Sequence, residues 1–145
     1  MNAFDRSAIA HYQSIEENFM SKKVPAGAVQ DSTAGPYSPV LEVRADTLVV
    51  ISGQVAVDLE GNVVGKTIEE QTRATLENCR LQLATAGCGF DDVFKVTAFL
   101  SNMEDWSRFN DVYVAIMPDP KPVRTAVGCV LYPGFLVEIE MWASK

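Results

Sequence analysis

One arginine in this sequence lies where it could bind an anion. Arg124 follows Pro120 and Pro122, which fix the backbone and lack amide donors, so the segment before it cannot be helix interior. The apolar run after Arg124 predicts a β-strand and puts the arginine at its mouth. A guanidinium held there is suited to bidentate binding of a carboxylate or phosphate. The alternative is an ordinary surface arginine at a loop exit.

Several other chemistries lack the residues they need. The single histidine, His11, lies in a segment that could be peripheral, so Ser-His and Cys-His mechanisms have no usual base. Cys79, Cys88 and Cys129 are odd in number and have no C-x-x-C spacing, which predicts small buried hydrophobic residues. We therefore expect neither disulfides nor a metal site.

Composition limits the class of protein. A chain of 145 residues is long enough for one domain with a sizeable core. The net charge is −7, and the 12 Lys and Arg residues form no basic run, which makes nucleic acid a poor partner. There is no apolar stretch long enough for a membrane span. The first residues lack the apolar core of a secretory signal, so we expect a cytoplasmic protein.

The chain is expected to divide into a short extension and one domain. Residues 1–22 form the extension, helical or partly disordered, and residues 23–145 form the domain. An amphipathic stripe supports a helix over residues 5–20: Ala8, Tyr12, Ile15 and Phe19.

Two further helices are predicted from caps and apolar stripes. Thr67 and Glu70 form a capping box that begins the first helix, and Gly87 ends it. Its buried stripe is Ile68, Thr72, Leu76, Cys79, Leu83 and Ala86. The second helix begins near Glu104, with Ser101 at capping-box spacing, and ends at Pro118. Its inner stripe is Trp106, Phe109, Tyr113 and either Ile116 or Met117.

Five strands complete the expected architecture. Their expected ranges are 40–44, 47–52, 93–100, 125–131 and 135–142. We expect the first pair to be a hairpin turning at Ala45-Asp46, and the last pair a hairpin turning at Tyr132-Pro133-Gly134. The order β-β-α-β-α-β-β predicts a mixed α+β sheet with both helices on one face.

The second face of this sheet is also expected to be apolar. Leu48 and Val50 alternate with other apolar residues, and a bare apolar face on a monomer would favour aggregation. We therefore expect a homo-oligomer. Glu138 and Glu140 should point toward that face, into a seam between subunits. Arg124 should lie beside the same seam, with Glu138 on the adjoining strand.

Seven motifs occur in an order that resembles the RidA family, also called the YjgF family. The resemblance covers about residues 24–143. The motifs are Gly35-Pro36-Tyr37-Ser38, Ile51-Ser52-Gly53-Gln54, Glu70-Gln71-Thr72-Arg73 with Leu76-Glu77-Asn78, Asp92-Val93-Phe94-Lys95-Val96-Thr97, Phe109-Asn110-Asp111-Val112-Tyr113, Pro122-Val123-Arg124-Thr125 and Val137-Glu138-Ile139-Glu140.

The resemblance implies a chorismate-mutase-like fold, assembled as a homotrimer with active sites between subunits. It implies hydrolysis of enamines and imines of 2-amino acids, such as 2-aminoacrylate, to a 2-keto acid and ammonia, without metal or cofactor. The substrate would be a small carboxylate. By position, Arg124 would bind that carboxylate, and Glu138 would position or activate water.

Four further positions correspond to the pocket of the family. Tyr37, Ser52 and Asn110 would line it, and the backbone around Ala126 would face the substrate. Many members have cysteine where this chain has Ala126, so a thiol is dispensable to the reaction and its loss bears on specificity.

The sequence leaves several alternative interpretations open. Glu138 could instead be a structural partner of Arg124 across the seam between subunits. Changes at residues 126–132 leave room for a larger substrate such as 2-aminomuconate. The protein could also bind 2-keto acids without catalysis. Ribonuclease activity, described for some relatives, comes last because the net charge is −7.

Overall fold

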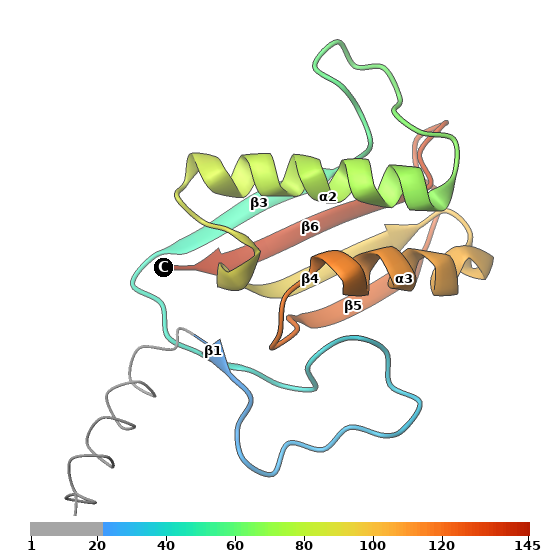
Figure 1. Ribbon diagram of the computed structural model, residues 1–145. Coiled ribbons are helices and arrows are strands. Elements are labelled where there is room, and N and C mark those ends of the chain that lie inside the picture. The colour runs from blue at the N-terminus through green and yellow to red at the C-terminus, as the bar shows by residue number, and fades with distance from the viewer. Residues whose placement is uncertain (1–21) are drawn as a thin grey trace, which may run out of the picture.

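The computed structural model describes residues 22–145. A four-stranded sheet carries two long helices on one face, and a small two-stranded sheet lies beside it (Figure 1). The expected extension, including His11, falls outside the described residues except for Lys22. The element order over the main sheet agrees with the predicted α+β architecture.

The main sheet is mixed. Its strands are β3 (Leu48–Gln54), β4 (Val93–Leu100), β5 (Val123–Gly128) and β6 (Val137–Ser144), in the order β3-β6-β4-β5. Strand β6 is antiparallel to both β3 and β4, whereas β5 is parallel to β4. The sheet therefore has β6 and β4 at its centre and β3 and β5 at its edges.

Both predicted hairpins are wrong. Strand β2 (Glu42–Val43) pairs with β1 (Lys22–Lys23) instead of β3. Strands β5 and β6 do not pair at all, because β4 lies between them. The reason is the helix that connects β4 to β5, because a crossover of this kind places the two strands parallel and side by side. After β5, the chain must then cross β4 before β6 can take its place at the centre of the sheet. Strand β5 is also shorter than predicted and ends at Gly128.

The first helix, α2 (Ile68–Thr85), begins as predicted. The Glu70 amide donates to Thr67 Oγ1 at 3.2 Å, and the Thr67 amide donates to Glu70 Oε2 at 3.2 Å, which completes the capping box. The predicted stripe is buried from Ile68 to Leu83, whereas Ala86 is the C-terminal cap.

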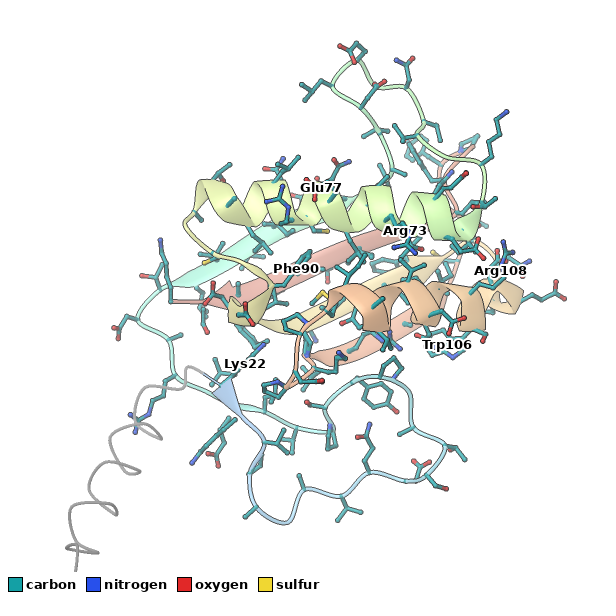
Figure 2. All side chains as sticks on the ribbon, viewed as in Figure 1. Lys22, Arg73, Glu77, Phe90, Trp106 and Arg108 are labelled. Carbon is teal, nitrogen blue, oxygen red and sulfur yellow. The ribbon has the colours of Figure 1, made fainter. Side chains whose placement is uncertain are left out.

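The second helix, α3 (Trp106–Ile116), follows a 3-10 turn, η2 (Met103–Asp105). The cap of this turn is Asn102, whose Oδ1 accepts from the Glu104 amide at 3.0 Å, and not the expected Ser101. Arg108 joins the helices, since it donates two hydrogen bonds to Glu69 of α2 at 2.6 and 2.7 Å (Figure 2).

The core lies between the helices and one face of the sheet. Alternate residues of β6 are fully buried there: Val137, Ile139, Met141 and Ala143. The opposite face carries the exposed apolar side chains Leu48, Val50, Val127 and Trp142, and we call it the open face. Phe99, Glu138 and Glu140 share this face through the strand register. The predicted second apolar face is thus present.

Lys22 fastens the small sheet to the large one. Its ammonium is buried and donates a hydrogen bond to the Val93 carbonyl at the start of β4, at 2.7 Å. Burial lowers the pKa of Lys22, and Asp91 and Asp92 oppose that shift.

Candidate active site

Arg124 lies near the start of β5, inside a group of four aromatic rings. It is opposite the buried Val96 of β4, so its side chain is on the helix-covered side of the sheet. The distances from its Cζ atom to the ring centroids are 4.6 Å for Tyr113, 5.1 Å for Trp106, 5.5 Å for Phe109 and 6.0 Å for Tyr37. We call these four residues the aromatic cage. Such cation–π contacts orient a guanidinium without occupying its N–H groups.

Among residues 22–145, the guanidinium of Arg124 has aromatic neighbours but no hydrogen-bond partner for its terminal nitrogens. Both terminal nitrogens, Nη1 and Nη2, are buried and unbonded among the described residues. Burial lowers the pKa of Arg124, partly offset by Tyr113 and Tyr37, yet a guanidinium remains charged at any physiological pH. A buried cation without an anion is unfavourable. This arrangement therefore favours binding of a small anion.

Two polar atoms of α3 are also buried and unbonded. The Tyr113 hydroxyl and the Asn110 Oδ1 atom have no hydrogen-bond partner in the part of the chain that the structure describes. Burial raises the pKa of Tyr113, with the charge of Arg124 opposing, so its hydroxyl stays neutral and can donate a hydrogen bond. Asn110 is four residues after Trp106 and three before Tyr113, a spacing that places the three on neighbouring positions of the helix.

The loop that carries Tyr37 is tied to the segment before Arg124. The Ser38 amide donates to the Pro122 carbonyl at 3.1 Å, and the Ser38 hydroxyl donates to the Lys121 carbonyl. Gly35 allows the loop to approach closely, because a Cβ atom there would lie 3.3 Å from Arg124 Nη2 and 3.2 Å from the Tyr37 ring. The loop thereby places one wall of the cage.

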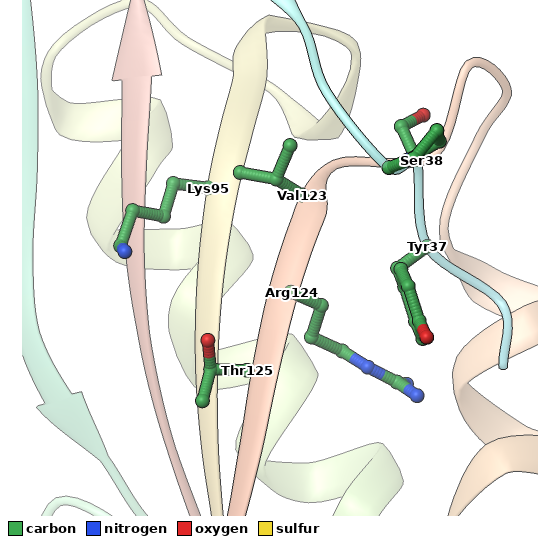
Figure 3. A pocket seen from close by; sticks show the side chains of 7 residues that line it. Tyr37, Ser38, Lys95, Val123, Arg124 and Thr125 are labelled. Carbon is green, nitrogen blue, oxygen red and sulfur yellow. The ribbon is translucent and has the colours of Figure 1, made fainter. Parts of the chain in front are cut away.

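A pocket of about 230 Å³ opens beside the arginine. In Figure 3 the Tyr37 ring lies alongside the guanidinium, whereas Lys95 points away from it. The lining residues are Tyr37, Ser38, Pro39, Lys95, Val123, Arg124 and Thr125.

Glu138 does not lie beside Arg124, contrary to the expectation from the sequence. It is on β6 opposite Phe99, whereas Arg124 is on β5 opposite Val96. The intervening strand β4 separates the two residues, and side chains that alternate along a strand place them on opposite faces. A structural ion pair between Arg124 and Glu138 within one chain is therefore excluded.

The Glu138 carboxylate lies over the end of β3. The pairing of β3 with β6 shifts register between Ile51 and Gln54, and Ser52 and Gly53 occupy this interval. A Cβ atom on Gly53 would lie 2.1 Å from Glu138 Oε1, which shows how closely the carboxylate approaches that glycine. Within residues 22–145 no hydrogen bond or ion pair reaches the Glu138 carboxylate. Ser52, which precedes Gly53 in the same interval, is exposed.

The predicted site residues thus form two groups. Arg124, Tyr37 and Asn110 lie at the β5 edge. Ala126 follows Arg124 by two residues on the same face of β5 and packs against the core. Ser52 and Glu138 lie toward the β3 edge. We call the set at the β5 edge the arginine group and the set toward the β3 edge the glutamate group. Within one chain the two groups lie apart, since β4 separates Arg124 from Glu138.

The aromatic cage is the feature that sequence reasoning missed. Trp106, Phe109 and Tyr113 were expected only as the inner stripe of a helix, which they also are. The available signal was their position on the helix directly before the strand of Arg124, together with Asn110 between them.

Comparisons with known proteins agree with this fold. The family model described as Endoribonuclease L-PSP matches residues 28–145. The mitochondrial protein mmf2 of Schizosaccharomyces pombe is 39% identical over 127 residues, which are 85% of this chain and 98% of the relative. The 2-iminobutanoate/2-iminopropanoate deaminase of Mus musculus is 34% identical over 126 residues, covering 86% of this chain and 92% of the relative.

A solved structure of a YjgF family member from Neisseria meningitidis superposes with a TM-score of 0.61 at 25% identity, covering 87% of this chain and 96% of the other. The chain belongs to the Endoribonuclease L-PSP family, which is the YjgF/RidA family that its motifs indicate. In residues 22–145 no helix is long and apolar enough to cross a membrane. The same residues contain no group of three or more His, Cys, Asp or Glu that could hold a metal ion.

Proposed function

We propose that this protein hydrolyses enamines and imines of small 2-amino acids to 2-keto acids and ammonia. The observation that carries the proposal is the buried guanidinium of Arg124, which is held by the aromatic cage and whose Nη1 and Nη2 are unbonded within residues 22–145. The mouse relative's name supports the substrate class, because 2-iminobutanoate and 2-iminopropanoate carry a carboxylate next to the C=N bond.

Each group of residues has a distinct task in this reaction. Arg124 binds the carboxylate through two parallel hydrogen bonds and so fixes the orientation of the C=N bond. An enamine first gains a proton at carbon and becomes an iminium ion. Water then adds to the C=N carbon, and the tetrahedral adduct loses ammonia to leave the keto acid. Glu138 orders the water, accepts its proton during the addition and returns that proton to the nitrogen, which then leaves as ammonia.

The separation of the two groups implies that a second copy of the chain completes the site. We infer a homotrimer in which Arg124 of one subunit faces Glu138 of its neighbour. The open face supports this assembly, because it carries Glu138 on β6 and exposes Leu48, Val50, Val127 and Trp142. Burial of this face between subunits would remove that apolar surface from water.

A second candidate function is binding of 2-keto acids without turnover. It is favoured by the arginine group alone, since one chain provides the anion site but not the carboxylate that would activate water. Ala126 bears on substrate choice, because a methyl group there leaves more room beside Arg124 than a larger side chain would. A bulkier substrate such as 2-aminomuconate therefore remains a candidate.

The test is to generate 2-aminoacrylate or 2-iminobutanoate in situ and to follow keto-acid release with and without the protein. We expect the unaltered protein to accelerate release and Arg124→Ala to abolish the acceleration. Glu138→Gln should lower the rate about 10²- to 10⁴-fold, the usual contribution of one acid–base group. Arg80→Ala is the matched control, because Arg80 is exposed and pairs with Glu77 on α2.

Equal rates for Arg124→Ala and the unaltered protein would refute the role of the arginine. Binding of 2-ketobutyrate with no turnover of any imine would favour the second candidate, and faster turnover of 2-aminomuconate would favour the larger substrate. The cytoplasmic location stays a prediction, and the mitochondrial name of the Schizosaccharomyces pombe relative makes cell fractionation the measurement to check it.

A further inference from the structure

Gly53 occupies a position where the backbone does not require a glycine. It lies in the interval where the pairing of β3 with β6 shifts register. Five other glycines adopt positive φ angles among the described residues, but Gly53 is not one of them. An L-residue could therefore follow the same backbone path without conformational strain. The reason for glycine must be sought in its surroundings.

The nearest atoms in those surroundings all belong to one side chain. A Cβ atom on Gly53 would meet Oε1, Cδ and Cγ of Glu138 at 2.1, 3.0 and 3.2 Å, and these are the three nearest atoms to it. Nonbonded carbon and oxygen atoms require a separation above about 3 Å, so a methyl group would push the carboxylate away by roughly 1 Å or more. The displaced group is the flexible end of a side chain, and the fold can therefore accommodate the change.

We propose that Gly53 is a positioning residue for Glu138, and that its missing side chain is the space in which the carboxylate is held. The inference rests on the proposed function, because it gives the position of Glu138 a catalytic consequence. Within residues 22–145 no hydrogen bond or ion pair fixes this carboxylate, so packing against Gly53 sets its direction. The arrangement also leaves both carboxylate oxygens free to accept hydrogen bonds from water.

A purely structural glycine would behave differently from a positioning residue. If Gly53 served only the register shift of β3, its replacement would lower stability and leave the chemistry of Glu138 unchanged in the folded protein. If it positions Glu138, replacement should lower kcat while substrate binding is retained, because Arg124 lies on the other face of the sheet. The two cases are separated by comparing kcat with KM and by combining the change with a change at Glu138.

The experiment compares Gly53→Ala, Glu138→Gln and the double variant, with Gly89→Ala as the control. Gly89 has nothing within 4 Å of an added Cβ atom and an extended φ of −127°, so its replacement should be silent. We expect Gly53→Ala to lower kcat about 10²-fold, the usual effect of a misplacement of about 1 Å. KM and the affinity for 2-ketobutyrate should change by less than about threefold.

The double variant should be at most about threefold slower than Glu138→Gln, because the effects of two changes that act through one group are not additive. Full activity of Gly53→Ala, or a double variant that loses the product of both single effects, would overturn the proposal. Crystal structures of the unaltered protein and Gly53→Ala provide a readout that does not need turnover. A carboxylate that stays in place in Gly53→Ala overturns the proposal. Absence of turnover in the unaltered protein refutes the proposed function instead.

Discussion

Replacing Arg124 with methionine is expected to stabilise the fold and to weaken anion binding at the same time. Methionine has a similar length, no charge, and a sulfur atom that packs well against aromatic rings. The variant therefore keeps the aromatic cage filled while removing the two buried, unbonded nitrogens Nη1 and Nη2. Function and stability should respond in opposite directions.

The magnitude follows from the surroundings of the guanidinium. Two unsatisfied buried nitrogens cost about 1 to 3 kcal/mol each, so about 2 to 6 kcal/mol together. Cation–π contacts return about 0.5 to 2 kcal/mol each, mainly from Tyr113 and Trp106, whose centroids lie at 4.6 and 5.1 Å. We expect a net gain of about 1 to 2 kcal/mol for Arg124→Met, which raises Tm by about 2 to 6 °C in a domain of this size.

A bound anion should reverse the order of stability of Arg124→Met and the unaltered protein. Loss of a bidentate, desolvated charge pair costs about 2 to 5 kcal/mol, so the affinity for 2-ketobutyrate should fall at least about 30-fold. At 100 times its Kd, a ligand stabilises the protein that binds it by about 2.7 kcal/mol. The unaltered protein should therefore melt above Arg124→Met in saturating 2-ketobutyrate and below it without ligand.

The assay is calorimetric melting at one fixed protein concentration, together with titration calorimetry of 2-ketobutyrate. Arg80→Met is the control, since it removes an exposed arginine that pairs with Glu77. A lower Tm for ligand-free Arg124→Met would show that the arginine supports the fold, and equal affinity for 2-ketobutyrate would show that it does not bind the anion. Either result refutes the reasoning.

Two other predictions concern the assembly and the first turn of α2. Coexpressed Arg124→Ala and Glu138→Gln chains should regain activity in mixed trimers, at about one quarter of the sites if subunits mix at random, and no recovery would refute a site shared between subunits. The amides of Lys66 and Thr67 lower the pKa of Glu70 from its ordinary 4.5, so its contribution is full above that value and is lost as the pH falls through the lower folded pKa. Glu70→Ala should therefore lower Tm at pH 7, and the difference in melting scans should shrink below about pH 4; a constant difference would contradict this.

The elements that could be predicted from the sequence are those whose signals are local. The Thr67–Glu70 capping box and the apolar stripe of α2 lie within the helix itself, and both are observed. Strand pairing depends on distant parts of the chain. The predicted turn at Tyr132 does form, since the Phe135 amide donates to the Tyr132 carbonyl at 3.1 Å. It joins strands that are not neighbours, because α3 has already placed β5 beyond β4.

For the candidate site too, individual residues could be predicted from the sequence, but contacts between distant parts of the chain could not. Motif positions identified Arg124 and Tyr37, and the structure brings them together in the aromatic cage. The stripe of α3 showed which face of the helix is buried, but periodicity does not show what that face contacts. The contact with Gly53 was likewise hidden, because a glycine in a strand has many possible reasons and only coordinates show the carboxylate against it.

The placement of Arg124 and Glu138 on opposite faces has a genetic consequence. In the proposed trimer each chain serves two sites, since it gives its arginine to one and its glutamate to the next. A chain that lacks both residues would fold, assemble with normal subunits and inactivate two sites of the trimer. A defective allele of this kind should therefore act as a partial dominant, reducing activity below the share of normal chains in the cell.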